Sequence, residues 1–130
     1  MSKQQKILVI DDDPSFITAM KPVLESRGYR VEAAYAKSEA AQKIKTFKPD
    51  LIVLDIMMER LSDGFDLCRD LKGDPKLKEI PVLAVSAINK EVGMRFSPKT
   101  DGEYFQADDF VEKPVSPEIL LERVEKLLKA

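Results

Sequence analysis

The stretch ILVIDDDPSF, from Ile7 to Phe16, joins four consecutive aliphatic residues to three consecutive aspartates. An unbroken apolar run of this length is typical of a strand buried on both faces, as in a parallel sheet covered by helices. Carboxylates at neighbouring positions repel one another by about 1–4 kcal/mol per pair at roughly 4 Å. A strand that ends in three of them therefore needs a compensating group nearby, and the rest of the chain must supply it.

The composition limits the kind of protein. Its 130 residues, 44% hydrophobic and 34% charged, predict one globular domain spanning 1–130. No apolar stretch approaches the roughly 20 residues that span a bilayer, and the first residues lack a signal-peptide core, so we expect a cytoplasmic protein without membrane insertion. A net charge of −2 with no long basic run argues against direct nucleic-acid binding. The chain has no histidine and one cysteine, Cys68, expected as a buried thiol; a bound metal would therefore need oxygen ligands.

Short apolar runs alternate with segments of helical periodicity along the chain. Such alternation predicts an α/β fold, in which a parallel sheet with right-handed crossovers is covered by helices on both faces. The expected strands are Ile7–Ile10, 29–34 as an edge strand, Leu51–Leu54, 81–86 and 109–114. The expected helices run from Phe16 to near Gly28, from Ala40 to Phe47, after Gly64, and from Ser116–Pro117 through Leu128.

The segment between the last two strands departs from this pattern. Its apolar residues recur two apart, and Gly93, Pro98 and Gly102 interrupt a helical periodicity. We expect Asn89–Asp101 to be largely irregular, so that the fourth helix of the fold is short or missing.

Polar residues stand at the carboxyl ends of the expected strands, where ligands bind in open parallel sheets. They are Asp11 and Asp12 after the first strand, Asp55 after the third, Ser86 at the end of the fourth and Lys113 after the fifth. Three acids, a hydroxyl and an amine are thus predicted to meet at one edge of the sheet.

Asp13 is assigned to a different role from its two neighbours. An aspartate before a first-turn proline, here Pro14, is a typical helix cap. Two of the three opening carboxylates are therefore assigned to chemistry and one to capping.

Four motifs carry a resemblance to a known family. They are VIDDDP, PDLIVLDIMM, VLAVSA and DDFVEKPV, and they follow one another in the family's order. Together they resemble a response-regulator receiver domain of two-component signalling, of the chemotaxis-regulator-like single-domain type, over nearly the whole chain. The resemblance implies a flavodoxin-like, doubly wound, five-stranded parallel sheet with the strand order 2-1-3-4-5.

The resemblance also implies roles for the polar residues. Asp55 resembles the phosphoacceptor. The acid pair Asp11 and Asp12 resembles the residues that, with Asp55 and the backbone carbonyl of Met57, hold Mg²⁺ or Mn²⁺. The physical chemistry agrees, since Mg²⁺ takes oxygen ligands and a cation relieves the repulsion among the three acids.

The remaining assignments are for the phosphoryl group. Ser86 resembles the hydroxyl that binds a phosphoryl oxygen, and Lys113, which precedes Pro114, resembles the lysine that pairs with the phosphoryl group. Phe110, three residues before Lys113, resembles the aromatic switch that acts with Ser86. An ordinary core phenylalanine on a strand explains Phe110 equally well.

Two stretches differ from the family's pattern. After Asp55 the chain reads MMERLSDG, where the family usually has the shorter MMPGMDG, and the segment from Ser86 to Lys113 is longer than usual. We therefore expect a different loop shape beside the metal, and the longer segment falls at the fourth helix, which belongs to the family's output face.

The expected function is that of a stand-alone receiver, a signalling phosphoprotein and not an enzyme. A sensor histidine kinase or a histidine phosphotransfer protein would phosphorylate Asp55, and output would follow by binding an unknown protein or by phosphorelay, from a monomer or weak dimer. One alternative is a pseudo-receiver, a structural binding module that is never phosphorylated. A second is a Mg²⁺-dependent phosphatase with Asp55 as nucleophile, which Met57 disfavours because such enzymes carry a second acid there.

Overall fold

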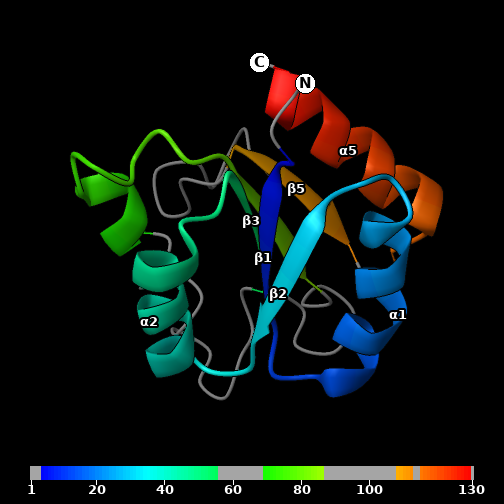
Figure 1. Ribbon diagram of the computed structural model, residues 1–130, viewed down its shortest axis with the longest axis horizontal. Helices are drawn as coiled ribbons and strands as arrows, with labels where there is room; N and C mark the ends of the chain where they lie inside the picture. Colours follow the sequence, from blue (N-terminus) through cyan, green and yellow to red (C-terminus); the bar gives the residue numbers. More distant parts are fainter. Residues whose placement is uncertain (1–3, 56–68, 87–107, 113–114, 130) are drawn as a thin grey trace.

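The computed structural model describes residues 4–55, 69–86, 108–112 and 115–129. Among these residues, five parallel strands form a single sheet in the order β2-β1-β3-β4-β5 (Figure 1). The strands are β1 (Lys6–Ile10), β2 (Arg30–Ala34), β3 (Leu51–Asp55), β4 (Val82–Ser86) and β5 (Asp109–Glu112). The helices are α1 (Pro14–Glu25), α2 (Lys37–Phe47) and α5 (Pro117–Lys129), and residues 69–73 are also helical.

The predicted α/β fold and strand order are confirmed, with β2 at one edge of the sheet as expected. The segment where the fourth helix was expected to be short or missing, Asn89–Asp101, lies outside the described residues. The same holds for Cys68.

The apolar runs form strands because both faces of the sheet are covered. Side chains alternate between the two faces along a strand. On β1, Leu8 and Ile10 belong to one buried cluster and Ile7 and Val9 to the other, and all four are fully buried. A polar residue in this run would leave a buried group to satisfy, which is why the run is aliphatic throughout.

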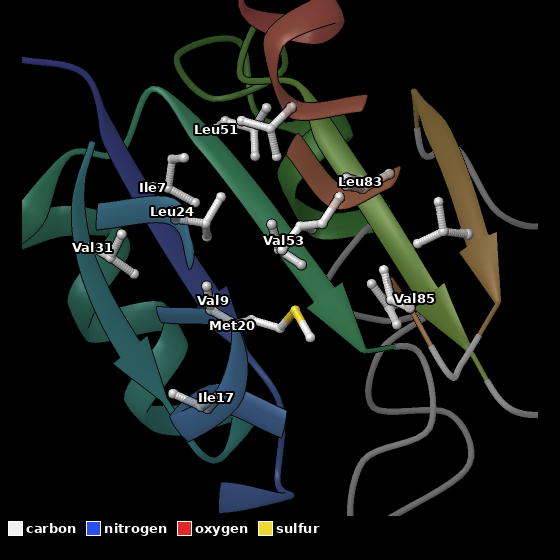
Figure 2. Close-up of a cluster of buried hydrophobic side chains, with 14 residues drawn as sticks. Ile7, Val9, Ile17, Met20, Leu24, Val31, Leu51, Val53, Leu83 and Val85 are labelled. Carbon is white, nitrogen blue, oxygen red and sulfur yellow. The ribbon is translucent and has the colours of Figure 1, made fainter. Parts of the chain in front are cut away.

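One face of the sheet lies under α1 and α5, which also contact each other. Helix α1 contributes Ile17, Met20 and Leu24, whose spacing of three and four residues places them on one side of a helix. Figure 2 shows these side chains against Val9 and Val53 from the central strands. Helix α5 adds two fully buried residues to the same cluster.

The other face lies under α2 (Figure 1), which packs through Ala40, Ile44 and Phe47. Leu71, from the helical segment 69–73, belongs to this cluster too. The two clusters together form the core of a doubly wound fold.

All the strand arrows point to the same edge of the sheet, while β1 begins and α5 ends at the opposite edge (Figure 1). The two helices α1 and α2 begin near the carboxyl ends of β1 and β2. The polar residues that follow the strands therefore collect at this carboxyl edge, as the sequence predicts.

An acidic candidate site at the carboxyl edge

The strand register brings Asp11 beside Asp55. Ile10, the last residue of β1, is paired with Leu54 of β3 on one side and with Ala34 of β2 on the other. The next residues along the chain are Asp11, directly after β1, and Asp55, the last residue of β3. The backbone N–H of Asp11 donates to the Ala34 carbonyl at 3.0 Å, so that the chain is still held against β2 when it reaches this acid.

Three carboxylates converge at this point. Asp11, Asp12 and Asp55 each offer an oxygen, and these atoms all lie within 4.8 Å of one another. Asp11 is 0% exposed and Asp55 5%, while Asp12 is more open to solvent. Aspartates are rarely this buried unless a partner or a metal compensates their charge. The three acids of the opening stretch and of β3 thus converge where a bound cation would compensate their charge.

Asp13 performs the capping role that its position before Pro14 predicts. Its side chain accepts a hydrogen bond from the Ser15 N–H at 2.9 Å and caps α1. Its own backbone N–H donates to Oδ1 of Asp11 at 2.8 Å. The division of the three aspartates is thus confirmed for Asp13, whose main chain also orients its buried neighbour.

The contact between Asp13 and Asp11 was not predicted, although the sequence holds a signal for it. Aspartate side chains commonly accept from the N–H two residues further along the chain. In a run of three aspartates before a helix, the first can bond to the third in this way. The result is a fixed carboxylate at the end of β1.

The donor set suits a hard divalent cation. Mg²⁺ binds oxygen ligands, usually one or two carboxylates with water and phosphate oxygens, and three carboxylates from two neighbouring strands provide such a set. Among the described residues, Asp11, Asp12 and Asp55 are the group that could hold a metal ion. Met57, predicted to add a backbone carbonyl, lies outside the described residues.

Ser86 ends β4 at the same edge of the sheet. Asp55 is paired with Val85, the residue before Ser86, and Ser86 itself is paired with Glu112 at the end of β5. Lys113 follows Glu112 in the sequence and lies outside the described residues. The backbone of Ser86 is therefore next in register to the acceptor strand, and the roles of Ser86 and Lys113 stay predictions.

Phe110 is partly buried on β5 and packs against the cluster under α2, together with Leu77 and Ile80. This is the environment of a core phenylalanine. The switch role implied by the resemblance stays a prediction for this residue.

Residues 7–125 match the family described as the response regulator receiver domain. The chain belongs to this family. The receiver is 38% identical over 125 residues to the alkaline phosphatase synthesis transcriptional regulatory protein PhoP of Bacillus subtilis, a match that covers 96% of this chain and 49% of the relative.

Solved receiver structures resemble it throughout. The signal receiver domain of a signal transduction histidine kinase from Syntrophus aciditrophicus is 32% identical, with a TM-score of 0.80 over 96% of this chain and 90% of that one. A CheY-like response regulator receiver domain protein from Methanospirillum hungatei is 25% identical, with a TM-score of 0.83 over 98% and 95% of the two chains.

Membership of the family gives the site its context. Receiver domains of two-component response regulators accept a phosphoryl group, bind Mg²⁺ at an acidic pocket and interact with histidine kinases or phosphotransfer proteins. The chain spans about half the length of the curated relatives it matches. In the described part of the receiver, no helix combines the length and the apolar character needed to cross a membrane.

Proposed function

We propose that Asp55 of this receiver is the phosphoryl acceptor and that the donor is a phosphohistidine of a sensor kinase or of a histidine phosphotransfer protein. The observation that carries the proposal is the position of Asp55. It ends the central strand, it is 5% exposed, and its carboxylate lies within 4.8 Å of those of Asp11 and Asp12.

The reaction transfers the phosphoryl group from nitrogen to oxygen. A carboxylate oxygen of Asp55 forms a bond to phosphorus while the P–N bond of the phosphohistidine breaks. The electron pair of that bond stays on the imidazole nitrogen, which takes up a proton, and Asp55 becomes an acyl phosphate. Such transfer depends on in-line positioning and charge neutralisation more than on proton transfer.

The chain's own residues supply the positioning. The Asp13 N–H holds the Asp11 carboxylate in place, and Asp12 and Asp55 complete the set that would hold Mg²⁺ with the Met57 carbonyl. When bound, Mg²⁺ supplies positive charge against the phosphoryl oxygens. We assign Ser86 to a phosphoryl oxygen and Lys113 to the charge of the same group.

We further propose that the receiver works as a signalling phosphoprotein of the cytoplasm, and not as an enzyme acting on a separate substrate. Phosphorylation would control the binding of another protein or feed a phosphorelay, with no direct contact to nucleic acid and no association beyond a weak dimer. Longer relatives include a regulator from Synechocystis described as DNA-binding, of which this chain matches 49%.

The alternative function is a pseudo-receiver that binds partners without phosphorylation. The assembled acid triad favours the acceptor, because a module used only for its surface gains nothing from clustering three carboxylates at one edge. In such a module, burial of Asp11 and Asp55 would lower the stability of the fold without serving any function.

Incubation with acetyl phosphate and Mg²⁺, followed by intact-mass measurement, tests the proposal. The expected result is a single phosphoryl adduct that is absent without Mg²⁺ and absent in Asp55→Asn. No adduct on a folded protein would favour the pseudo-receiver. Rapid turnover of the phosphodonor without a lasting adduct would favour the phosphatase.

A further inference from the structure

Lys72 is buried at the opposite edge of the sheet from the acidic site. It lies in the helical segment 69–73, and its side chain is only 11% exposed. The ammonium group donates to the carbonyls of Lys78 at 3.2 Å and Ile80 at 3.0 Å, and to Oδ2 of Asp108 at 2.7 Å. A lysine is seldom this buried unless it is paired and fully hydrogen-bonded, and here all three donors have acceptors.

Asp108 ties the starts of β4 and β5 together. The oxygen that accepts from Lys72 also accepts from the Val82 N–H at 2.8 Å, and the Asp108 N–H donates to the Val82 carbonyl at 2.9 Å. Lys72 and Asp108 therefore form a clamp, by which we mean this ion pair with its backbone contacts. The clamp joins the segment before β4 to the first residues of both strands.

Strand β5 is short and is paired on one side only. It has four residues and lies at an edge of the sheet, where β4 is its neighbour, and Arg123 of α5 also holds it by donating to Oδ1 of Asp109 at 2.8 Å. A slip by one residue would exchange Phe110 and Val111 between the two faces of the sheet. The pairing of Leu83 with Asp109 follows directly from the contacts that Asp108 makes.

We propose that Lys72 is a positioning residue for the phosphoryl site. By holding Asp108 against Val82, it sets the register of β5 on β4, and with it the position of Glu112 beside Ser86; Lys113 follows Glu112 in the sequence. This inference rests on the proposed function, since it assigns the phosphoryl group to Lys113. Lys72 itself lies at the other edge and touches no reacting atom.

The clamp acts on phosphoryl binding and not on the metal. Asp11 and Asp12 directly follow β1 and Asp55 ends β3, and the mutual register of these two strands does not involve β5. Loss of the clamp should therefore weaken phosphoryl binding and leave Mg²⁺ affinity unchanged, whereas a general loss of structure would weaken both.

The experiment compares Lys72→Met with the wild-type protein and with Lys76→Met, which removes an equal charge from an exposed position four residues further along the chain. In Lys72→Met we expect phosphorylation by acetyl phosphate to slow by roughly tenfold or more, because displaced groups lose their orientation. Beryllofluoride should bind correspondingly more weakly, with Mg²⁺ affinity within twofold of wild type. Lys72→Arg should recover much of the rate, and Lys76→Met should match wild type.

Wild-type phosphorylation and beryllofluoride binding in Lys72→Met would overturn the proposal. A parallel loss of Mg²⁺ affinity and phosphorylation would also overturn it, since that is the mark of a merely structural role. If Lys72→Met does not fold, Asp108→Asn takes its place, because this variant keeps an acceptor for the Val82 N–H and removes the ion pair. Phosphorylation of Asp108→Asn at the wild-type rate would overturn the inference.

If the wild-type receiver takes up no phosphoryl group at all, the proposed function fails separately from the clamp. The register of β5 is then measured directly, by NMR contacts between Leu83 and Asp109. Retention of these contacts in Lys72→Met would overturn the role of Lys72, and their loss would support it.

Discussion

At the scale of single residues, Asp12 and Asp13 are chemically identical neighbours in different environments. Asp12 contributes a carboxylate oxygen to the acidic cluster, whereas the Asp13 side chain turns to the Ser15 N–H at the start of α1. Position relative to Pro14 decides which aspartate becomes the cap. The contact that orients Asp11 comes from the backbone N–H of Asp13, a donor that alanine at position 13 would also have.

Asp12→Ala and Asp13→Ala should therefore affect different properties, metal binding in the first variant and helix stability in the second. Asp12→Ala should weaken Mg²⁺ binding and phosphorylation together, since it removes one oxygen of the cluster. Asp13→Ala should cost about 0.5–2 kcal/mol of unfolding free energy through loss of the helix cap and leave Mg²⁺ affinity nearly unchanged. Calorimetric Mg²⁺ titration and urea unfolding measure the two effects; loss of Mg²⁺ binding in Asp13→Ala would contradict the division of the three aspartates.

Other single residues escape prediction because their environment comes from distant parts of the chain. Lys72 would ordinarily be assigned to the solvated face of a helix, and only the fold brings Asp108 and two carbonyls to it.

At the scale of elements, the sequence predicts all five strands found in the described part of the chain. The central strands β1, β3 and β4 leave an uninterrupted hydrophobic signal because they are buried on both faces, whereas the edge strands β2 and β5 mix polar and apolar residues. Helix α1 ends at Glu25, close to the predicted stop, and Gly28 takes up a φ of 88° that suits glycine and turns the chain toward β2. The predicted strands are therefore reliable to within a residue or two at their ends.

The start of α2 shows that apolar periodicity alone does not locate the first residue of a helix. Its apolar periodicity begins at Ala40, but the helix begins at Lys37, after Ala36, which has no capping side chain. Glu39 in the first turn instead accepts from the N–H of Tyr35, the residue before Ala36, at 2.6 Å. A search for Ser, Thr, Asp or Asn before the helix cannot find this arrangement.

Helix α5 offers a matched pair of neighbours that tests the packing of one face. Leu120 is 0% exposed within the cluster under α1 and α5, whereas Ile119 is 45% exposed. Leu120→Ala should lower the unfolding free energy by about 2–5 kcal/mol, because it leaves a cavity in the core. Ile119→Ala should change it by about 0.5 kcal/mol or less.

Urea unfolding of the two variants gives the comparison. The unfolding free energies can be subtracted if both fall with urea concentration at the same slope. Equal losses in Leu120→Ala and Ile119→Ala would mean that α5 does not pack on the sheet through Leu120.

At the scale of the whole molecule, the topology explains why the acids could be assigned from sequence. Parallel strands all present their carboxyl ends at one edge, so residues far apart in the chain meet there once the strand order is fixed. Asp11 and Asp55 meet for this reason. The contacts at the opposite edge, around Lys72 and Asp108, follow no comparable rule, because strand starts carry no general ligand-binding role.

The assembled acid cluster also couples metal binding to folding. Only the folded chain brings the three carboxylates together, so Mg²⁺ should raise the unfolding free energy by RT ln(1 + [Mg²⁺]/Kd), about 2.7 kcal/mol at one hundred times Kd. Thermal unfolding with and without Mg²⁺ measures this. The rise in Tm should shrink sharply in Asp12→Ala and persist in Asp13→Ala, and an equal rise in all three proteins would contradict a site at the acidic cluster.

The central claim is that Asp55 carries the phosphoryl group. The most direct measurement is to phosphorylate the receiver with Mg²⁺ present, reduce the acyl phosphate with borohydride, and locate the resulting homoserine by peptide mass spectrometry. We predict homoserine at position 55 alone, with none at Asp11 or Asp12 and none without the phosphodonor. Homoserine at either of those two positions, or its absence at 55 in a protein that gained the phosphoryl mass, would contradict the account.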